Sequence, residues 1–284
     1  MRSFLLIILG FVLALTASAF AQETSGKTDP QAIGDLRIAT GQKDIASAWL
    51  IAPTTRYPHF IIGSKYEPSG LRVKLANGKV LTLMLDKDQV FEDRTPRLAD
   101  LNGDGRDEII LVLTSLTKGA SLAAYSVAGD KLVLTAKTDF IGRAFRWLNP
   151  AGIADYDGDG RLDVALVQKP HLVKRLEMWS LEDGKFVRSQ SIDDVSNHRI
   201  NSKNTDMAAS ADFNGDGIVD LAILSGNYTK VRVFSFAGGR AKEIGRFDLP
   251  APADGDFTLV RFAQGWQLRV PLLNIADYAL NLAL

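Results

Sequence analysis

Near its middle the sequence reads Asp155-Tyr156-Asp157-Gly158-Asp159-Gly160-Arg161-Leu162-Asp163. The same pattern occurs twice more, at residues 100–108 and 212–220. Each copy places oxygen-bearing side chains at positions 1, 3, 5 and 9 and glycine at positions 4 and 6. A loop that turns on glycine can point alternate side chains inward, and Ca²⁺ takes six or more oxygen ligands. Three copies with one spacing therefore predict three calcium loops, whereas a single copy would indicate only an acidic turn.

The EF-hand, another calcium-binding loop, does not fit these stretches. It needs a bidentate glutamate at position 12, where the three loops carry Leu111, Leu166 and Ile223. It also needs a helix after the loop, but apolar runs of strand length follow here, at residues 109–112, 164–167 and 221–224. The sequence thus predicts calcium loops inside β-hairpins.

The first residues have the pattern of a secretory signal peptide. Arg2 precedes an apolar run over residues 4–15, and Ala19-Phe20-Ala21 forms a small-x-small cleavage site. The run is short for a membrane span, so we expect residues 1–21 to be removed, with a retained N-terminal anchor as the alternative. The protein is then exported, periplasmic or secreted, without membrane insertion after cleavage. Residues 22–35 are polar and are predicted to form a flexible leader before one domain at residues 36–284.

The composition excludes several kinds of site. The absence of cysteine removes disulfides, cysteine–zinc sites and thiol nucleophiles. Without Arg2 the 33 Lys and Arg residues become 32, against 33 Asp and Glu, so nucleic acid is not an expected partner. The three histidines, His59, His171 and His198, lack zinc-ligand spacing and are expected at surface or turn positions. No G-x-S-x-G or P-loop motif is present, so no catalytic residue is predicted.

The acidic loops recur with a period typical of a propeller or solenoid. They begin at residues 100, 155 and 212, which gives steps of 55 and 57. Turn pairs recur with a similar period, each between two strand-like runs, at Asn77-Gly78, Gly129-Asp130, Asp183-Gly184 and Gly238-Gly239. Each unit consists of a strand, the acidic loop, an apolar strand and a hairpin, which matches one propeller blade. The predicted fold is an all-β propeller of about five four-stranded antiparallel blades, with calcium loops in three of them.

The first and last units are degenerate copies. When residues 48–63 are aligned with residues 96–111, the ligand positions are filled by Ala52, Thr54 and Arg56, which cannot hold calcium. In the last unit, residues 257–262 and 266–272 form a hairpin and residues 278–284 a third strand. We expect residues 36–38 to supply the fourth strand, because sharing a blade between the chain ends leaves no open sheet edge.

With these motifs the chain resembles the FG-GAP/VCBS repeat family, whose D-x-[DN]-G-D-G-x-x-D loops also occur in the integrin α-subunit propeller. The resemblance covers approximately residues 48–272. It implies a β-propeller that binds about three Ca²⁺ ions through side chains at positions 1, 3, 5 and 9 and the carbonyl at position 7. The implied ligands are Asp100, Asn102, Asp104, Arg106 and Glu108; Asp155, Asp157, Asp159, Arg161 and Asp163; and Asp212, Asn214, Asp216, Ile218 and Asp220. Glu108 departs from the aspartate of the family pattern, which indicates different or weaker binding there.

A basic and aromatic cluster precedes the inner strands of three successive units. Its central members are Arg97, Arg146, Trp147 and Asn201, which are predicted to lie at the mouth of the ring opposite the calcium loops. Arginine binds carboxylate, sulfate or phosphate, and an exposed tryptophan offers a flat face to a sugar ring. The alternative is that the arginines cover apolar strand ends and Trp147 packs between blades.

Two function classes remain open. We expect a monomeric, non-catalytic module that recognises a protein or glycan ligand, anionic or carbohydrate-bearing, at the mouth opposite the calcium. The alternative is an extracytoplasmic hydrolase or lyase that uses the central channel, since propellers host both kinds of function. Two carboxylates that meet across the channel would favour hydrolysis.

Overall fold

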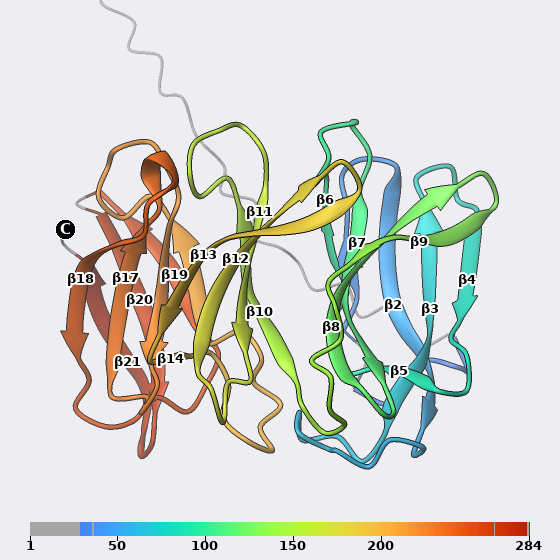
Figure 1. The fold of residues 1–284 in the computed structure, drawn as a ribbon. Helices are drawn as coiled ribbons and strands as arrows, with labels where there is room; N and C mark the ends of the chain where they lie inside the picture. The colour runs from blue at the N-terminus through green and yellow to red at the C-terminus, as the bar shows by residue number, and fades with distance from the viewer. Residues whose placement is uncertain (1–28, 36, 264, 283) are drawn as a thin grey trace, which may run out of the picture.

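A computed structural model describes residues 29–35, 37–263, 265–282 and 284 (Figure 1). The predicted signal peptide, residues 1–21, lies outside this part of the chain. The described residues form strands and one short 3-10 turn, Ala237–Gly239 (η2), but no α-helix, which confirms the all-β prediction. In this part of the chain no helix has the length and apolarity needed to cross a membrane.

Five antiparallel sheets follow one another along the chain, and we name them A to E in that order. Sheet A contains β1 (Ala39–Thr40), β2 (Ile45–Thr54), β3 (Glu67–Leu75) and β4 (Val80–Met84). Sheet B contains β5 (Gln89–Phe91), β6 (Arg97–Ala99), β7 (Glu108–Ser115), β8 (Gly119–Ala128) and β9 (Lys131–Lys137). Sheet C contains β10 (Leu148–Ala154), β11 (Asp163–Gln168), β12 (Arg175–Glu182) and β13 (Lys185–Asp193). Sheet D contains β14 (Val195–Ser196), β15 (Ala208–Ala211), β16 (Asp220–Ser225), β17 (Lys230–Ser235) and β18 (Lys242–Asp248), and sheet E contains β19 (Thr258–Phe262), β20 (Gly265–Leu272) and β21 (Ile275–Leu282).

The strand after each acidic loop is the most deeply buried strand of its sheet. The three apolar runs identified in the sequence lie in β7, β11 and β16, and every residue of β7 is buried. The four turn pairs lie between β3 and β4, β8 and β9, β12 and β13, and β17 and β18, as predicted. At Asp183-Gly184 both residues have positive φ, 47° and 74°, as a type I′ hairpin turn requires.

The first strand of most sheets is interrupted, and the chain leaves the sheet at each interruption. In sheet B, β5 and β6 both pair with β7 and are separated by residues 92–96. In sheet D, β14 and β15 both pair with β16 and are separated by residues 197–207. Single bridges, Ala32 to Ile51 and Ala253 to Leu272, indicate the same arrangement in sheets A and E. We call residues 33–38, 92–96, 197–207 and 254–257 the first-strand excursions.

The first-strand excursions meet one another and are joined by ion pairs. The pairs are Asp35 with Arg94 (2.6 Å) and Lys203 (2.8 Å), and Arg37 with Asp206 (3.2 Å) and Asp256 (3.7 Å). These residues come from sheets A, B, D and E. The ion pairs therefore bring the first-strand sides of sheets A, B, D and E close to one another.

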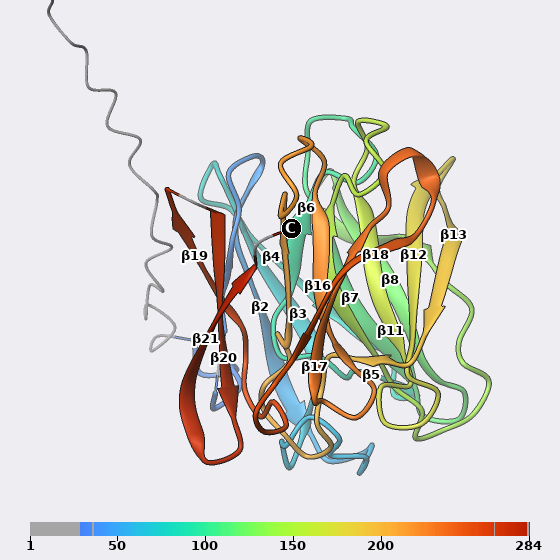
Figure 2. The same ribbon diagram turned by 90° about the vertical axis from the view of Figure 1, so that its left-hand side faces the viewer.

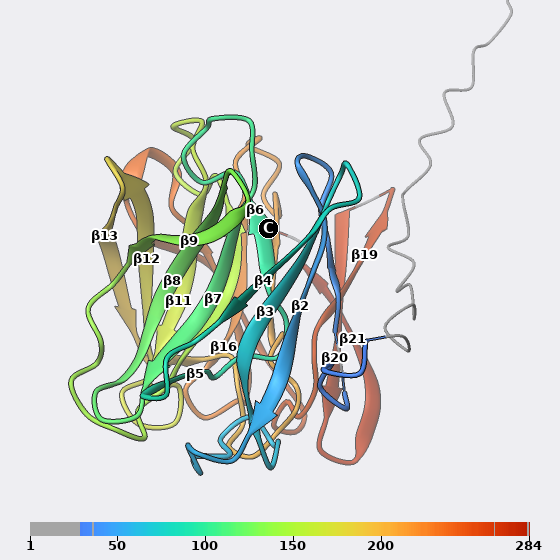
Figure 3. The ribbon, with the colours of Figure 1, turned by 90° about the vertical axis from the view of Figure 1, so that its right-hand side faces the viewer.

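Hydrophobic clusters fill the spaces between successive sheets. One cluster joins A to B, the next B to C, the third C to D and the fourth D to E. Figure 3 shows β2, β3 and β4 of sheet A beside β7, β8 and β9 of sheet B, and Figure 2 shows sheet E, in red, at one edge of the molecule. Among the clusters that the described residues form, none joins sheet E to sheet A.

The segment that was expected to complete sheet E does not pair with it, and the residues that follow this segment pair with sheet A. Strand β1 begins at Ala39 and pairs with β2, while Arg37 and Ile38 lie outside any strand, and Leu36 is not among the described residues. Sheet E therefore has three strands, and the prediction of a shared blade is wrong. Only residues 41–44 separate β1 from β2, so this pairing closes a far shorter loop than pairing with sheet E.

Two further expectations for the N-terminal region are wrong. Ala52 and Thr54, which were aligned with the calcium-ligand positions, lie inside β2. In sheet A the turn at residues 41–44 connects the two strands that the acidic loops connect in sheets B, C and D. The run at residues 60–62 resembled a strand because Ile61 and Ile62 are buried in the cluster between sheets B and C. Of the expected flexible leader, residues 22–28 lie outside the described part of the chain, whereas residues 29–35 are packed, since Trp49 Nε1 donates to Asp29 Oδ2 at 2.8 Å.

Candidate calcium loops and the opposite mouth

The three acidic loops share one backbone conformation. They connect β6 to β7, β10 to β11 and β15 to β16, and Figure 1 shows the first two at the upper end of their sheets. The glycines at position 4 have φ of 75°, 81° and 79°, and those at position 6 have φ of 87°, 89° and 89°. Only glycine adopts these angles without strain, so the glycine spacing determines how each loop turns.

The acidic side chains hold the loops in shape by accepting hydrogen bonds from the backbone. Asp155 Oδ1 accepts from Gly158 N at 2.8 Å, and Asp155 Oδ2 accepts from Gly160 N at 2.9 Å. Asp100 and Asp212, at the same position of the other loops, each accept two amides at 2.6–3.0 Å. A carboxylate oxygen has two lone pairs, so these bonds orient the side chains and leave capacity for a cation.

Three carboxylates converge in the second loop. One oxygen from each of Asp155, Asp157 and Asp159 lies within 4.8 Å of the other two. Like charges at this range repel one another unless a cation lies between them. Oxygen donors alone, some from carboxylates and some neutral, are the set that Ca²⁺ prefers. The first and third loops have Asn102 and Asn214 at position 3, and therefore one carboxylate fewer.

The carboxylates at position 9 are buried, but they are not satisfied equally. Burial raises the pKa of Glu108 and Asp220, and it raises the pKa of Asp163 to about 6. Among the described residues, Asp220 Oδ1 has no hydrogen-bond partner. Glu108 Oε1, in contrast, accepts from Asn102 Nδ2 at 3.0 Å and from Ser126 Oγ at 3.1 Å. The third loop thus holds an oxygen that a cation could use, whereas Glu108 of the first loop already has partners within the protein.

Trp147, which was predicted to be an exposed part of the recognition surface, is buried. Its residue is 3 % exposed, and its Nε1 donates to Glu92 O at 2.8 Å. The indole stacks on His171 and meets the ring of His198 edge-on, with ring centroids 6.1 Å and 4.7 Å away. The prediction is wrong, because Trp147 lies in the apolar cluster between sheets B and C.

Arg97, another predicted recognition residue, is engaged inside sheet B. Its Nη1 donates at 2.9 Å to Asp93 Oδ2, which also accepts from Val112 N at 2.9 Å. The Arg97 side chain is 19 % exposed. The Arg97 guanidinium is therefore engaged within the protein, and its role in ligand binding stays a prediction.

Arg146 and Asn201 lie at one mouth, at the end of the sheets opposite the acidic loops. Both adjoin the connection from β2 to β3. Phe145, the residue before Arg146, donates its backbone N–H to Tyr57 Oη at 2.6 Å, and Asn201 N donates to Ile61 O at 2.9 Å. We call this region the opposite mouth. Phe145 is its exposed aromatic residue, with 43 % of its surface accessible and its ring stacked on Tyr57 at 5.0 Å.

The backbone of Phe145 is strained. Its φ is 55°, which costs a residue other than glycine about 1–2 kcal/mol. The hydrogen bond to Tyr57 and the bond from Arg146 Nη1 to Phe145 O at 2.7 Å hold it in this conformation. Such outliers often lie at functional positions, where neighbouring contacts stabilise them.

The three histidines converge beneath the opposite mouth; His59 and His171 lie in turns, as predicted, whereas His198 is buried in the connection between β14 and β15. His198 Nε2 donates to Ser202 O at 2.9 Å, which leaves His198 Nδ1 to accept from His171 Nε2 at 2.9 Å. His59 Nδ1 lies 2.5 Å from Glu92 Oε1. Burial lowers the pKa of His171 to about 4 and that of His198 to about 3, so both are neutral at neutral pH. Their spacing in the sequence carries no sign of this cluster, because each comes from a different connection.

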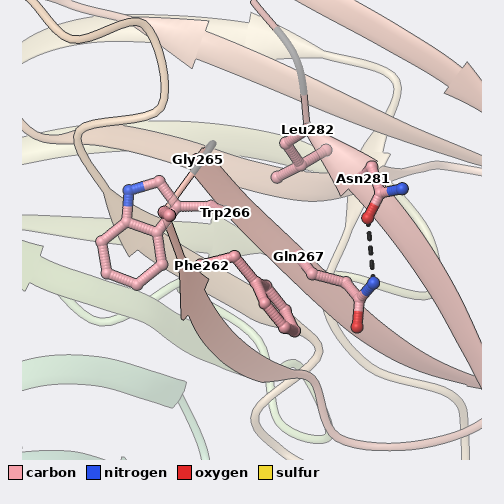
Figure 4. Close-up of a pocket in the computed structure, with 7 residues that line it drawn as sticks. Phe262, Gly265, Trp266, Gln267, Asn281 and Leu282 are labelled. Carbon is pink, nitrogen blue, oxygen red and sulfur yellow. Dashed lines mark hydrogen bonds between the residues drawn. The ribbon is translucent and has the colours of Figure 1, made fainter.

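A cavity of about 440 Å³ lies on sheet E, beside the ends of β19, β20 and β21 (Figure 4). Trp266 lines it together with Gln267, whose Nε2 donates to Asn281 Oδ1 at 2.9 Å. The Trp266 indole donates to Asp212 O at 2.8 Å, and the guanidinium of Arg261 lies 4.7 Å from its ring centre. Since both its polar edge and one face are engaged, Trp266 does not offer a free binding platform.

Comparison with known families and structures supports the sequence interpretation in part. Residues 100–166 match the family described as FG-GAP-like repeat, which confirms the resemblance over the first two acidic loops. Two crystal structures of BBS1N in complex with ARL6DN, soaked with mercury and with lead, are similar to the chain with a TM-score of 0.48 and 10 % identity. The similarity covers 89 % and 87 % of this chain but 66 % and 62 % of those chains, so this chain spans about two thirds of their length. No curated protein matches the sequence.

Proposed function

We propose that the chain, which carries an FG-GAP-like repeat at residues 100–166, is an exported, calcium-binding β-propeller that recognises a protein partner without catalysis. The observation that carries this proposal is the shared conformation of the three acidic loops, with similar glycine angles and the same backbone hydrogen bonds to the side chains at positions 3 and 5. The five sheets serve as five blades.

Calcium would be held by the side chains at positions 1, 3, 5 and 9 of each loop and by the carbonyl at position 7. Two observations support the fit. The carboxylates of Asp155, Asp157 and Asp159 converge, and Asp220 Oδ1 is buried without a partner among the described residues. Bound Ca²⁺ would neutralise these charges and tie the strand before each loop to the strand after it.

The recognition surface is the opposite mouth, with Phe145 rather than Trp147 as its aromatic residue. Arg146 and Asn201 border it, and two further exposed basic residues adjoin it, since Gly142 N donates to Lys118 O at 2.8 Å and Arg143 precedes Phe145 by two positions. In the described part of the chain, Lys118, Arg143 and Arg146 have no acidic partner within 4 Å. These basic side chains around the exposed ring of Phe145 favour an acidic protein segment that also carries an apolar side chain.

A peptide array that contains acidic and basic sequences, with a glycan array beside it, tests the recognition surface. We expect the chain to bind acidic peptides, and Phe145→Ala and Arg146→Ala to weaken this binding without changing the melting temperature. Phe262→Ala is the matched control, because Phe262 is similarly exposed, at 49 %, but lies on sheet E. Binding to glycans alone, or equal binding by Phe145→Ala and the control, would contradict the proposal.

The alternative function, a hydrolase or lyase in the central channel, has less support. It requires carboxylates that are free to act on a substrate at the centre. Of the aspartates of the first-strand excursions, Asp35, Asp93 and Asp206 are held by arginine at 2.6–3.2 Å, whereas Asp256, whose pKa is raised by burial, lies 3.7 Å from Arg37. A carboxylate held by a guanidinium at hydrogen-bond distance is poorly suited to accept or donate a proton at neutral pH.

A further inference from the structure

The ammonium group of Lys43 reaches from sheet A into the first acidic loop of sheet B. Its Nζ donates to Asp100 Oδ2, which belongs to the carboxylate at position 1 of that loop. The Lys43 side chain is 39 % exposed, whereas that of Asp100 is 11 % exposed. Lys43 lies in the β1–β2 turn, the turn that stands where sheets B, C and D carry acidic loops. Sheet A thus lacks an acidic loop of its own and places a cation against the loop of its neighbour.

The turn that carries Lys43 is held rigidly beside the first loop. Asp44 Oδ1 accepts from Asp107 N at 2.8 Å, and Asp44 Oδ2 accepts from Arg106 Nε at 3.1 Å. A Cβ atom at Gly41 would lie 2.2 Å from Ile45 O, so only glycine fits at this point of the turn. The backbone of Lys43 is therefore held where its side chain can reach Asp100.

The first loop differs from the other two because a lysine contacts its carboxylate at position 1. Asp100 Oδ2 accepts from Gly105 N at 2.9 Å as well as from Lys43. Among the described residues, neither Asp155 nor Asp212, at the same position of the second and third loops, has a lysine or arginine partner. At the four side-chain ligand positions the first and third loops carry equal numbers of carboxylates, three each. The first loop also contains Arg106 and Asp107, whose charges offset each other, so Lys43 is the main remaining charge difference between the two loops.

Solvent and ions can reach the Lys43–Asp100 pair. A cavity of about 570 Å³ is lined by Lys43, Asp100 and Asp107, and on its other side by Gly160 and Arg161 of the second loop. An ion that enters this cavity meets the ammonium group and the loop carboxylates together. Exchange of one cation for another at Asp100 therefore requires a rotation of the lysine side chain but no movement of the sheets.

We infer that Lys43 is the resident cation of the first loop, and that calcium binds this loop only in competition with it. The inference rests on the proposed calcium binding and deepens it, because it assigns the weakest of the three affinities to the first loop. Without metal, Lys43 compensates the charge of Asp100 and joins sheets A and B. One unit charge at contact range of a divalent ion, at a site open to solvent, changes its affinity by roughly tenfold.

Calorimetric titration of the metal-free chain tests this inference. In a background of Asp159→Ala and Asp216→Ala, which disables the second and third loops, we expect Lys43→Met to tighten calcium binding by roughly tenfold. Lys43→Arg keeps the charge and should keep the affinity. Lys79→Met is the matched control, because Lys79 pairs with Asp130 in the hairpin turns of the same two sheets and is similarly exposed, at 44 %. Melting in chelator should fall for Lys43→Met more than for the control.

The outcomes separate this inference from the proposal on which it rests. If Lys43→Met leaves the affinity of the first loop unchanged or weakens it, Lys43 is not a competing cation and the inference is wrong. If the unmodified chain binds no calcium at any loop, the proposed calcium binding is wrong, and the competition inferred for Lys43 is wrong with it. If the variant with both loops disabled does not fold, the titration is made on the chain with all three loops intact. Lys43→Met should then tighten the weakest of the three calcium affinities, and an unchanged weakest affinity would contradict the inference.

Discussion

Asp159 lies in the loop with the greatest negative charge, and it gives the most direct comparison between loops. The second loop has four carboxylates, at Asp155, Asp157, Asp159 and Asp163, and more ligand charge generally tightens calcium binding. Asp159→Ala should therefore remove the tightest calcium site, whereas Asp104→Ala should remove a weaker one. Calorimetric titration of both variants checks the order, and an equal loss of affinity in the two would contradict it.

Trp147 is predicted to stabilise the fold rather than to bind a ligand. Its indole fills the space between sheets B and C and hydrogen-bonds Glu92 O, so truncation leaves a cavity and an unpaired carbonyl. Trp147→Ala should lower the free energy of unfolding by about 3–5 kcal/mol, as other truncations of large core residues do. Urea denaturation measures this loss. Phe262→Ala is the control, because Phe262 is 49 % exposed and its truncation should change the free energy of unfolding little. A Trp147→Ala variant as stable as the control would show that the residue is not part of the core.

His171 and His198 should make stability depend on pH. In the folded chain burial lowers their pKa values to about 4 and about 3, whereas an exposed histidine in the unfolded chain has a pKa near 6.5. Between about pH 4 and pH 6.5 the unfolded chain binds more protons, so the free energy of unfolding rises with pH and levels off above pH 6.5. Each unit of pKa displacement corresponds to about 1.4 kcal/mol.

Denaturation of the chain and of a His171→Asn, His198→Gln double variant over this pH range measures the effect. Subtraction of the two curves removes the contribution of carboxylates, which the variants share. We expect the difference in stability between them to narrow as the pH falls toward 4. Parallel curves would mean that the histidines are not buried in their neutral form.

The loop residues could be predicted from the sequence, but their surroundings could not. Glycines at positions 4 and 6 allow the positive φ angles that this loop needs, so its turn and its inward side chains could be predicted from the spacing. Whether Trp147 faces solvent depends on how sheets B and C pack, and local sequence carries no information on that. Phe145 and Lys43 were missed for the same reason, since their roles depend on residues far away in the chain, Tyr57 and Asp100.

The strands and hairpins could be predicted because their signals are local. Apolar runs and turn pairs repeat with the acidic loops, and the structure places strands β7, β11 and β16 and four hairpins accordingly. The first strands were harder to predict, because they are short and interrupted, and β1 has only two residues. A two-residue strand has no alternating pattern, so only its partner β2 defines it.

The first-strand excursions should contribute to stability through their ion pairs. Arg94 is 5 % exposed and joins Asp35 at 2.6 Å, so its loss leaves a partly buried carboxylate with Lys203 and the Tyr66 hydroxyl as partners. Arg94→Met should lower the free energy of unfolding by about 3 kcal/mol, the lower end of the range for a broken buried pair. Arg175→Met, which breaks an exposed pair with Asp193, should change the free energy of unfolding much less, because solvent screens exposed pairs. Equal losses in urea denaturation would contradict the role of the excursions.

The sheets are held to one another by two kinds of contact. Apolar clusters join A to B, B to C, C to D and D to E, while ion pairs of the excursions link A, B, D and E. The repeat period predicted the number of sheets, since each unit forms one sheet. It could not predict where the N-terminal segment pairs, because that choice is decided by competition between sheets A and E.

Calcium should stabilise the whole molecule, because each loop ties two strands of one sheet. Titration of the metal-free chain with Ca²⁺, with melting followed in parallel, measures this stabilisation. We expect about three ions per chain and a gain of about 2.7 kcal/mol per independent site at calcium a hundredfold above Kd, with Mg²⁺ a poor substitute. A chelator should then lower the melting temperature. A melting temperature indifferent to both calcium and chelator, with no bound ions, would contradict the calcium function of the three loops.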